Sequence, residues 1–138
     1  MLFSFLNDPF VEAIAKRCRS VVARQPGACH DIAATLSLPA DALQGFLNPE
    51  ERCIDTVFLI DLVASLVHEC GMDPRWLLTG EYDGEMHRKA LLVGEDRGSQ
   101  GARSIRALVV QAYGELRRSK YFFSLPMLRE GSIGKGKQ

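Results

Sequence analysis

The sequence has little of several features that mark specialised classes of protein. Its 138 residues contain no apolar run close to the roughly 20 residues that a membrane-spanning helix requires. The start, MLFSFLNDPF, lacks the basic segment and the small-residue cleavage site of a secretory signal peptide. None of the four cysteines forms a C-x-x-C pair. We therefore expect a cytoplasmic protein that does not bind membranes and whose cysteines are reduced and mostly buried.

The residue patterns of metal sites and of common enzymes are absent as well. Cys29 and His30 are adjacent, and the spacing between His68 and Cys70 is unusual for zinc. The chain contains no phosphate-binding glycine loop, no nucleophile elbow and no metalloprotease helix. We therefore predict that the protein is not an enzyme and binds neither a metal nor a cofactor.

The charges that are present are distributed unevenly along the chain. The formal net charge is zero. Residues 1–83 nevertheless hold six Lys or Arg against twelve Asp or Glu, whereas residues 84–138 hold eleven against five. The first part is therefore acidic and the second part basic, which bears on what each part can bind.

Helical periodicity dominates the first 83 residues, and no stretch alternates like a strand. The segment MDPRWLLTGEYD shows the usual start and stop signals. Asp73 can cap a helix, Pro74 suits its first position, and Gly80 can end it. Trp76 is expected to fill the bottom of the domain. The spacing of apolar residues predicts five helices, over residues 8–24, 30–36, 39–47, 55–70 and this short segment.

The rest of the chain reads as an extension of this helical domain. Weak helical character continues to Val93, and a glycine-rich linker is expected over residues 94–101. A long amphipathic helix then follows over residues 104–124. We therefore divide the chain into a helical domain (1–83), a linker with a C-terminal helix (84–125) and a flexible tail (126–138).

The stretch DIAATLSLPADALQGFLN has the form of a helix-turn-helix. Two short helices flank a turn of about three residues, and Ala33 is small where the helices must pack closely. Together with the ending LVHECGMDPRWLLTGEYD, it resembles the Cro/lambda-repressor-like (Xre-type) helix-turn-helix family, in its phage-repressor branch. The resemblance covers residues 29–83. It implies an all-α fold in which a five-helix DNA-binding domain carries a C-terminal helical extension.

In that family the second helix of the motif reads bases in the major groove of double-stranded DNA. Carried over by position, the resemblance implies DNA contacts at seven residues, namely Cys29, Pro39, Ala40, Asp41, Gln44, Gly45 and Asn48. Gln44 is well suited to adenine, whereas Ala40 can meet only a thymine methyl group and Asp41 repels nearby phosphates. The chain also departs from the family at Ser37, where the turn usually has glycine.

Two functions follow from these observations. The motif favours a DNA-binding transcriptional regulator, as a homodimer that matches paired half-sites. The acidic charge favours the alternative, a degenerate helix-turn-helix that binds another protein, because DNA affinity depends on Lys and Arg. In the first case the basic C-terminal residues would supply phosphate contacts: Arg103, Arg106, Arg117, Arg118, Lys120, Lys135 and Lys137. The apolar face of the C-terminal helix could form the dimer or pack back on the domain.

Overall fold

The computed structural model describes residues 9–48, 54–95 and 99–124, and within these ranges it is all-α, without strands. Side chains are described except for Ser99 and residues 120–124. The seven helices are α1 (Pro9–Ala23), α2 (Cys29–Leu36), α3 (Ala40–Leu47), α4 (Thr56–Cys70), α5 (Pro74–Thr79), α6 (Gly84–Gly94) and α7 (Ser99–Ser124).

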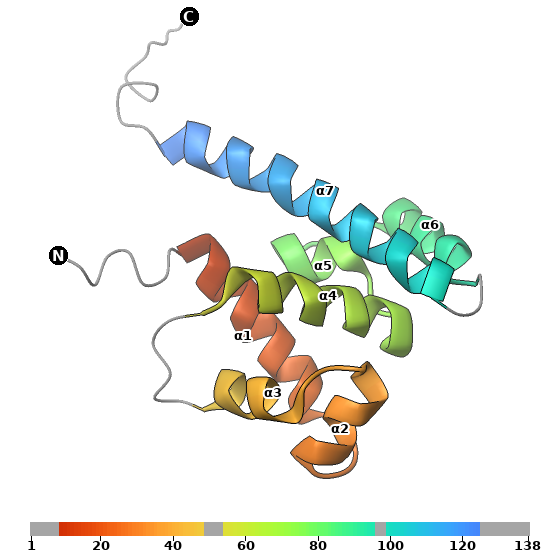
Figure 1. The fold of residues 1–138 in the computed structure, drawn as a ribbon. Helices are drawn as coiled ribbons and strands as arrows, with labels where there is room; N and C mark the ends of the chain where they lie inside the picture. Colours follow the sequence, from red (N-terminus) through yellow and green to blue (C-terminus); the bar gives the residue numbers. More distant parts are fainter. Residues whose placement is uncertain (1–8, 49–53, 96–98, 125–138) are drawn as a thin grey trace, which may run out of the picture.

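Helix α4 lies at the centre of the molecule, with the α2–α3 pair on one side and α7 on the other (Figure 1). Its sequence is apolar nearly all round, as a helix with neighbours on several sides must be. Leu59, Leu62 and Leu66 of α4 are completely buried, and α1 adds Ile14 and Cys18 to the same core. Helices α1, α2, α5, α6 and α7 all pack on α4, and α3 contacts it through the Phe46 and Phe58 rings, so α4 is the central helix of the fold.

The first five helices agree with the predicted ranges to within about one residue, because their end signals are strong. Asp55 caps α4, accepting hydrogen bonds from the Val57 and Phe58 amides, and Gly71 ends that helix in a left-handed conformation. Asp73 caps α5, and Gly80 ends α5 in the same way as Gly71 ends α4. All-α architecture, predicted from periodicity, is therefore confirmed.

The chain after residue 83 is more regular than its sequence predicts. Asp83 caps a complete helix α6 by accepting hydrogen bonds from the Glu85 and Met86 amides. The glycine-rich linker expected over residues 94–101 is wrong in its bounds, because Gly94 still belongs to α6 and α7 begins at Ser99. Packing outweighs the low helix propensity of glycine here, since Gly101 is buried. The predicted tail, 126–138, lies outside the described residues.

The apolar face of α7 packs back on the bundle. Ile105 and Val109 are completely buried, and the Tyr113 ring stacks on Phe10 of α1 at 5.6 Å between ring centroids. The sequence left open whether this apolar face forms a dimer or packs on the domain, and the structure shows it packed on the domain. The opposite face of α7 lies in solvent.

The segment around Trp76 is fixed mainly by residues other than the tryptophan. Trp76 is half-buried at the edge of the core, so its prediction as a buried plug is wrong. In so short a helix Pro74, Leu77 and Leu78 occupy the inward face, which leaves Trp76 on the flank.

Hydrogen bonds complete this arrangement. Asp73 is the one buried charged residue of the described ranges, and it accepts a hydrogen bond from the Asp83 amide at 2.7 Å. Arg17 donates to the Leu77 carbonyl at 3.1 Å. His87 donates from Nε2 to the Gly71 carbonyl at 2.8 Å, which ties α6 to the end of α4. These hydrogen bonds, rather than burial of Trp76, hold α5 and its neighbouring turns in place.

Candidate nucleic-acid interface

Helices α2 and α3 are joined by a turn with a defined backbone geometry. Ser37 adopts a left-handed conformation, with φ of 59° and ψ of 43°. The Leu38 amide donates to the Ala33 carbonyl at 2.9 Å, which closes the end of α2 as a Schellman motif. Serine thus occupies a backbone position that suits glycine better.

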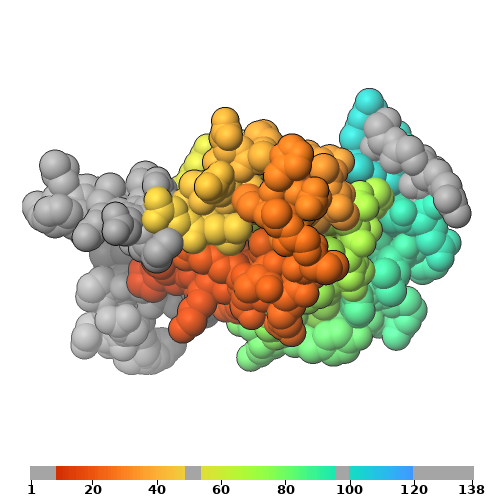
Figure 2. Space-filling model, turned by 90° about the horizontal axis from the view of Figure 1, so that it is seen from below, coloured from red at the N-terminus to blue at the C-terminus, as the bar shows by residue number. Residues whose placement is uncertain are grey.

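The inner sides of α2 and α3 meet the core through a small set of apolar residues. Ile32, Ala33 and Leu36 of α2 are buried, as are Leu43 and Phe46 of α3. The small side chain of Ala33 allows the close approach of the two helices that the sequence indicated. The opposite sides of both helices form one face of the molecule, seen in Figure 2.

Four of the seven predicted contact residues form one stripe on that face. Asp41, Gln44, Gly45 and Asn48 follow the spacing i, i+3, i+4, i+7, and the side chains of Asp41, Gln44 and Asn48 are exposed. A Cβ atom added to Gly45 would meet nothing within 4 Å, so the surface there is open.

The other three predicted residues lie at the edges of this stripe. Ala40 is half-buried against the core, and Cys29 is half-buried in the first turn of α2. Pro39 is exposed and immediately precedes α3. The structure therefore places Gln44 within the exposed stripe and Ala40 at its half-buried edge.

The first turns of α2 and α3 differ from those of α4, α5 and α6. Ala28 and Pro39 stand at their N-caps, and neither side chain accepts a hydrogen bond from the helix. The last three helices named are each capped by an aspartate. Uncapped amides and the positive end of the helix dipole favour an anion such as a phosphate, whereas Asp31 in the first turn of α2 and Asp41 in the first turn of α3 oppose one.

Basic side chains are scarce around the exposed stripe. The chain holds no Lys or Arg from Gln25 to Glu51. Asp31, Asp41 and Asp55 are all exposed on or beside α2 and α3. Because nonspecific DNA affinity comes from neutralising phosphates, this face offers less of it than a typical DNA-binding surface.

Arg19 contributes to this region as a support, which the sequence alone did not indicate. Its Nε donates to the Phe46 carbonyl in the last turn of α3 at 2.9 Å, and its guanidinium lies 4.6 Å from the centroid of the Phe46 ring. The positive charge also suits the negative end of the helix dipole. Arg19 thus fixes α3 onto α1. In the sequence, the one hint of an inward contact is that Arg19 lies one helical turn after Ala15, which is buried.

A hollow of about 250 Å³ lies between α3 and the start of α4. Its apolar lining includes Phe46, Ile54 and Phe58, with the two phenylalanine rings 5.6 Å apart between centroids. Asp41 and Asp55 also line it and bring two carboxylates to its wall. This hollow therefore adjoins the stripe and combines apolar surface with negative charge.

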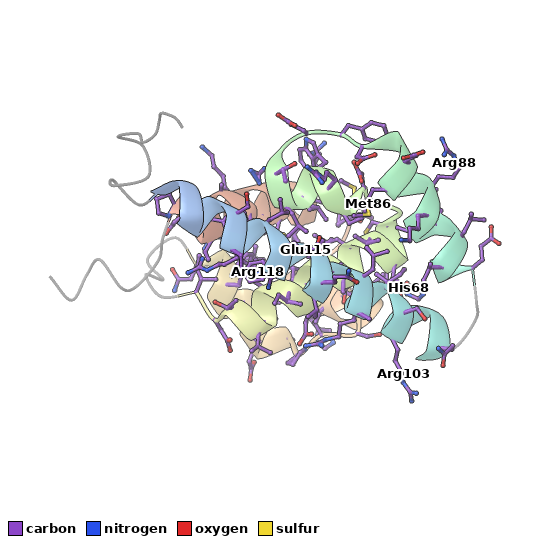
Figure 3. The ribbon with its side chains drawn as sticks, turned by 90° about the horizontal axis from the view of Figure 1, so that it is seen from above. His68, Met86, Arg88, Arg103, Glu115 and Arg118 are labelled. Carbon is purple, nitrogen blue, oxygen red and sulfur yellow. The ribbon has the colours of Figure 1, made fainter. Side chains whose placement is uncertain are left out.

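The basic residues of α7 are divided between two locations. Arg106 pairs with Asp61 of α4 at 2.7 Å and lines a cavity of about 300 Å³ that also reaches Ser37 and Pro39. Arg103 points outward near the start of α7, whereas Arg118 lies farther along the helix (Figure 3). Beyond its start, α7 runs on the other side of α4 from α2 and α3 (Figure 1), so Arg118, labelled in Figure 3, lies away from the exposed stripe of the same chain. The Lys120 side chain, Lys135 and Lys137 lie outside the described side chains.

Other kinds of site find little support in the described ranges. No three His, Cys, Asp or Glu side chains there are placed to hold a metal ion. None of the helices in those ranges is long and apolar enough to cross a membrane. Burial raises the pKa of the Cys18 thiol to about 12, which makes it a poor nucleophile.

Comparison with known families, curated proteins and solved structures finds no match to this chain. Its function has to be inferred from the geometry described above.

Proposed function

We propose that the protein is a DNA-binding transcriptional regulator that reads double-stranded DNA with α3, as a homodimer on paired half-sites. The observation that carries the proposal is the helix-turn-helix arrangement itself. An exposed stripe containing Gln44 runs along α3, and a tight left-handed turn at Ser37 sets α3 against α2. An α-helix exposed in this way can enter the major groove, where the amide of Gln44 can pair with adenine.

The phosphate contacts in this proposal come from helix ends more than from basic side chains. The uncapped first turns of α2 and α3 offer backbone amides to phosphate oxygens. Arg103 and Arg106 lie near the start of α7, and Arg106 shares a cavity with the α2–α3 turn. Contacts of this type position the protein on DNA while the stripe supplies selectivity.

The test is retention of mixed genomic DNA fragments by the full-length protein at low and moderate salt. Some fragments should be retained selectively, and Gln44→Ala should abolish that selectivity. Gln111→Ala is the matched control, because Gln111 is an exposed glutamine on α7. Selectivity that survives Gln44→Ala would contradict a reading role for α3. Absence of retention at either salt concentration would contradict DNA binding altogether.

The charge distribution supports a second candidate, a degenerate helix-turn-helix that binds another protein. The face formed by α2 and α3 carries exposed aspartates and no Lys or Arg. Such a face is complementary to a basic protein surface. Asp41→Ala separates the two functions, because it should strengthen DNA binding and weaken binding to a basic protein.

A further inference from the structure

Two further surfaces of the molecule are complementary in charge and shape, and the first of them shares Asp41 and Gly45 with the stripe on α3. One is the hollow between α3 and the start of α4, which is lined by apolar side chains and by Asp41 and Asp55. The other is the outward face of α7. We propose that these surfaces bind each other between two copies of the chain, so that α7 of one copy occupies the hollow of the other.

The outward face of α7 is a continuous stripe. Residues opposite its buried face recur at helical spacing, and all are exposed except the half-buried Gly114: Arg103, Ala107, Val110, Gly114, Arg117 and Arg118. Arg106 lies on the flank of the helix, where it pairs with Asp61. Val110 is 41% exposed, which is high for a valine on a helix that packs against a domain. The stripe is basic at both ends and apolar or small in the middle.

The hollow has the complementary character. Phe58 and Ile54 provide apolar surface, and Val57 in the neighbouring turn is 61% exposed. Within the described part of the chain, no ion pair or hydrogen bond occupies the Asp41 carboxylate. One oxygen of Asp55 caps α4, and the other has no partner among those residues. Two carboxylates beside an apolar hollow suit a guanidinium on an aliphatic stem.

The size of the hollow favours a side chain over a small molecule. At about 250 Å³ it lies below the range of roughly 300–1,000 Å³ that is usual for ligand pockets. An arginine side chain fits this description, and the stripe on α7 presents Arg118, with the exposed Val110 about two helical turns away.

The contact has to form between copies because the two surfaces face away from each other within one chain. Helix α4 separates α3 from α7, and the distal part of α7 crosses the far side of the bundle (Figure 1). A two-fold axis would let each α7 meet the other copy's hollow, so the dimer would contain the contact twice. This pairing covers Asp41 and Gly45 of the exposed stripe. It is therefore a different dimer from the one proposed to bind DNA and competes with it, so the Arg118→Glu protein, in which the pairing is weakened, should retain DNA at least as well as the wild type.

Sedimentation of the full-length chain over a range of concentrations tests the pairing. The wild type should form dimers that weaken at high salt, because exposed ion pairs are screened. Asp41→Lys and Arg118→Glu should each raise the dimer Kd by at least about tenfold, since each places like charges together. Asp31→Lys and Arg88→Glu are the matched controls, because both residues are exposed and lie outside the two surfaces. Thermal melting of each variant establishes that it is folded.

A mixture of the Asp41→Lys and Arg118→Glu proteins provides the decisive step. In a mixed dimer with reciprocal contacts, each hollow again faces a residue of opposite charge, so dimerisation should return to near the wild-type level. A wild type that stays monomeric, a dimer that neither substitution weakens, or a mixture that does not recover would each overturn the pairing. None of these results depends on DNA, so the pairing and the proposed DNA binding can fail separately.

Discussion

Replacing Asp73 by alanine should destabilise the protein by about 3 kcal/mol. The Asp73 carboxylate is only 4% exposed and serves two groups. It caps α5 at the Arg75 amide, which contributes about 1 kcal/mol. It also accepts from the Asp83 amide at 2.7 Å, and a charged hydrogen bond of this kind contributes roughly 1.5–3 kcal/mol. Chemical denaturation followed by circular dichroism measures the loss of unfolding free energy. Thermal unfolding should show a fall in the melting temperature of roughly 10 °C.

Two further variants separate the cap from the second hydrogen bond. Asp73→Asn keeps one acceptor oxygen, so it can satisfy only one of the two amides and should cost about half as much. Asp83→Ala removes a cap of the same chemistry from α6, at a more exposed position, and should cost about 1 kcal/mol. If Asp73→Ala destabilises the protein no more than Asp83→Ala does, the hydrogen bond to the Asp83 amide contributes nothing and the reasoning fails.

Three other predictions concern single positions. Ser37→Gly should raise the free energy of unfolding by about 0.5–1 kcal/mol, because glycine adopts φ of 59° without strain; an unchanged denaturation midpoint would contradict this. Trp76→Ala should cost about 2–3 kcal/mol, below the roughly 3–5 kcal/mol for a fully buried aromatic residue, and its melting curve decides between the two. Alkylation followed by mass spectrometry should modify Cys29 and Cys70 in the native protein before Cys18, which is completely buried. Because burial raises the pKa of Cys18 from 9.0 to about 12, the stability linked to that thiol is complete below pH 9 and is lost as the pH rises from 9 towards 12. Melting temperatures that stay constant over that range of pH would contradict this linkage.

The parts of the fold that the sequence predicted well are those with local signals. Asp55 with Gly71, and Asp73 with Gly80, define the two ends of α4 and of α5 through backbone chemistry that involves only neighbouring residues. The start of α7 was missed because its first turn contains Ser99 and Gly101, whose local preferences are outweighed by packing. Trp76 was misplaced because residue size predicts burial only on average.

In the candidate interface, too, the features set by local spacing could be predicted and those set by tertiary packing could not. The stripe on α3 follows from helical spacing, so Asp41, Gln44 and Asn48 could be placed together from the sequence. The hollow could not be predicted, because it forms where α3 meets the beginning of α4, and this depends on tertiary packing. The contact of Arg19 with Phe46 joins residues 27 positions apart for the same reason.

The difference in helix capping has a consequence for isotope exchange with solvent. Amides in the first turns of α4, α5 and α6 are engaged by aspartate side chains, whereas those of α2 and α3 are not. We therefore expect the first-turn amides of α2 and α3 to exchange faster than the capped amides of α4, α5 and α6. An anion bound at that face would slow both groups, and a partner bound at the far side of the bundle would leave them unchanged.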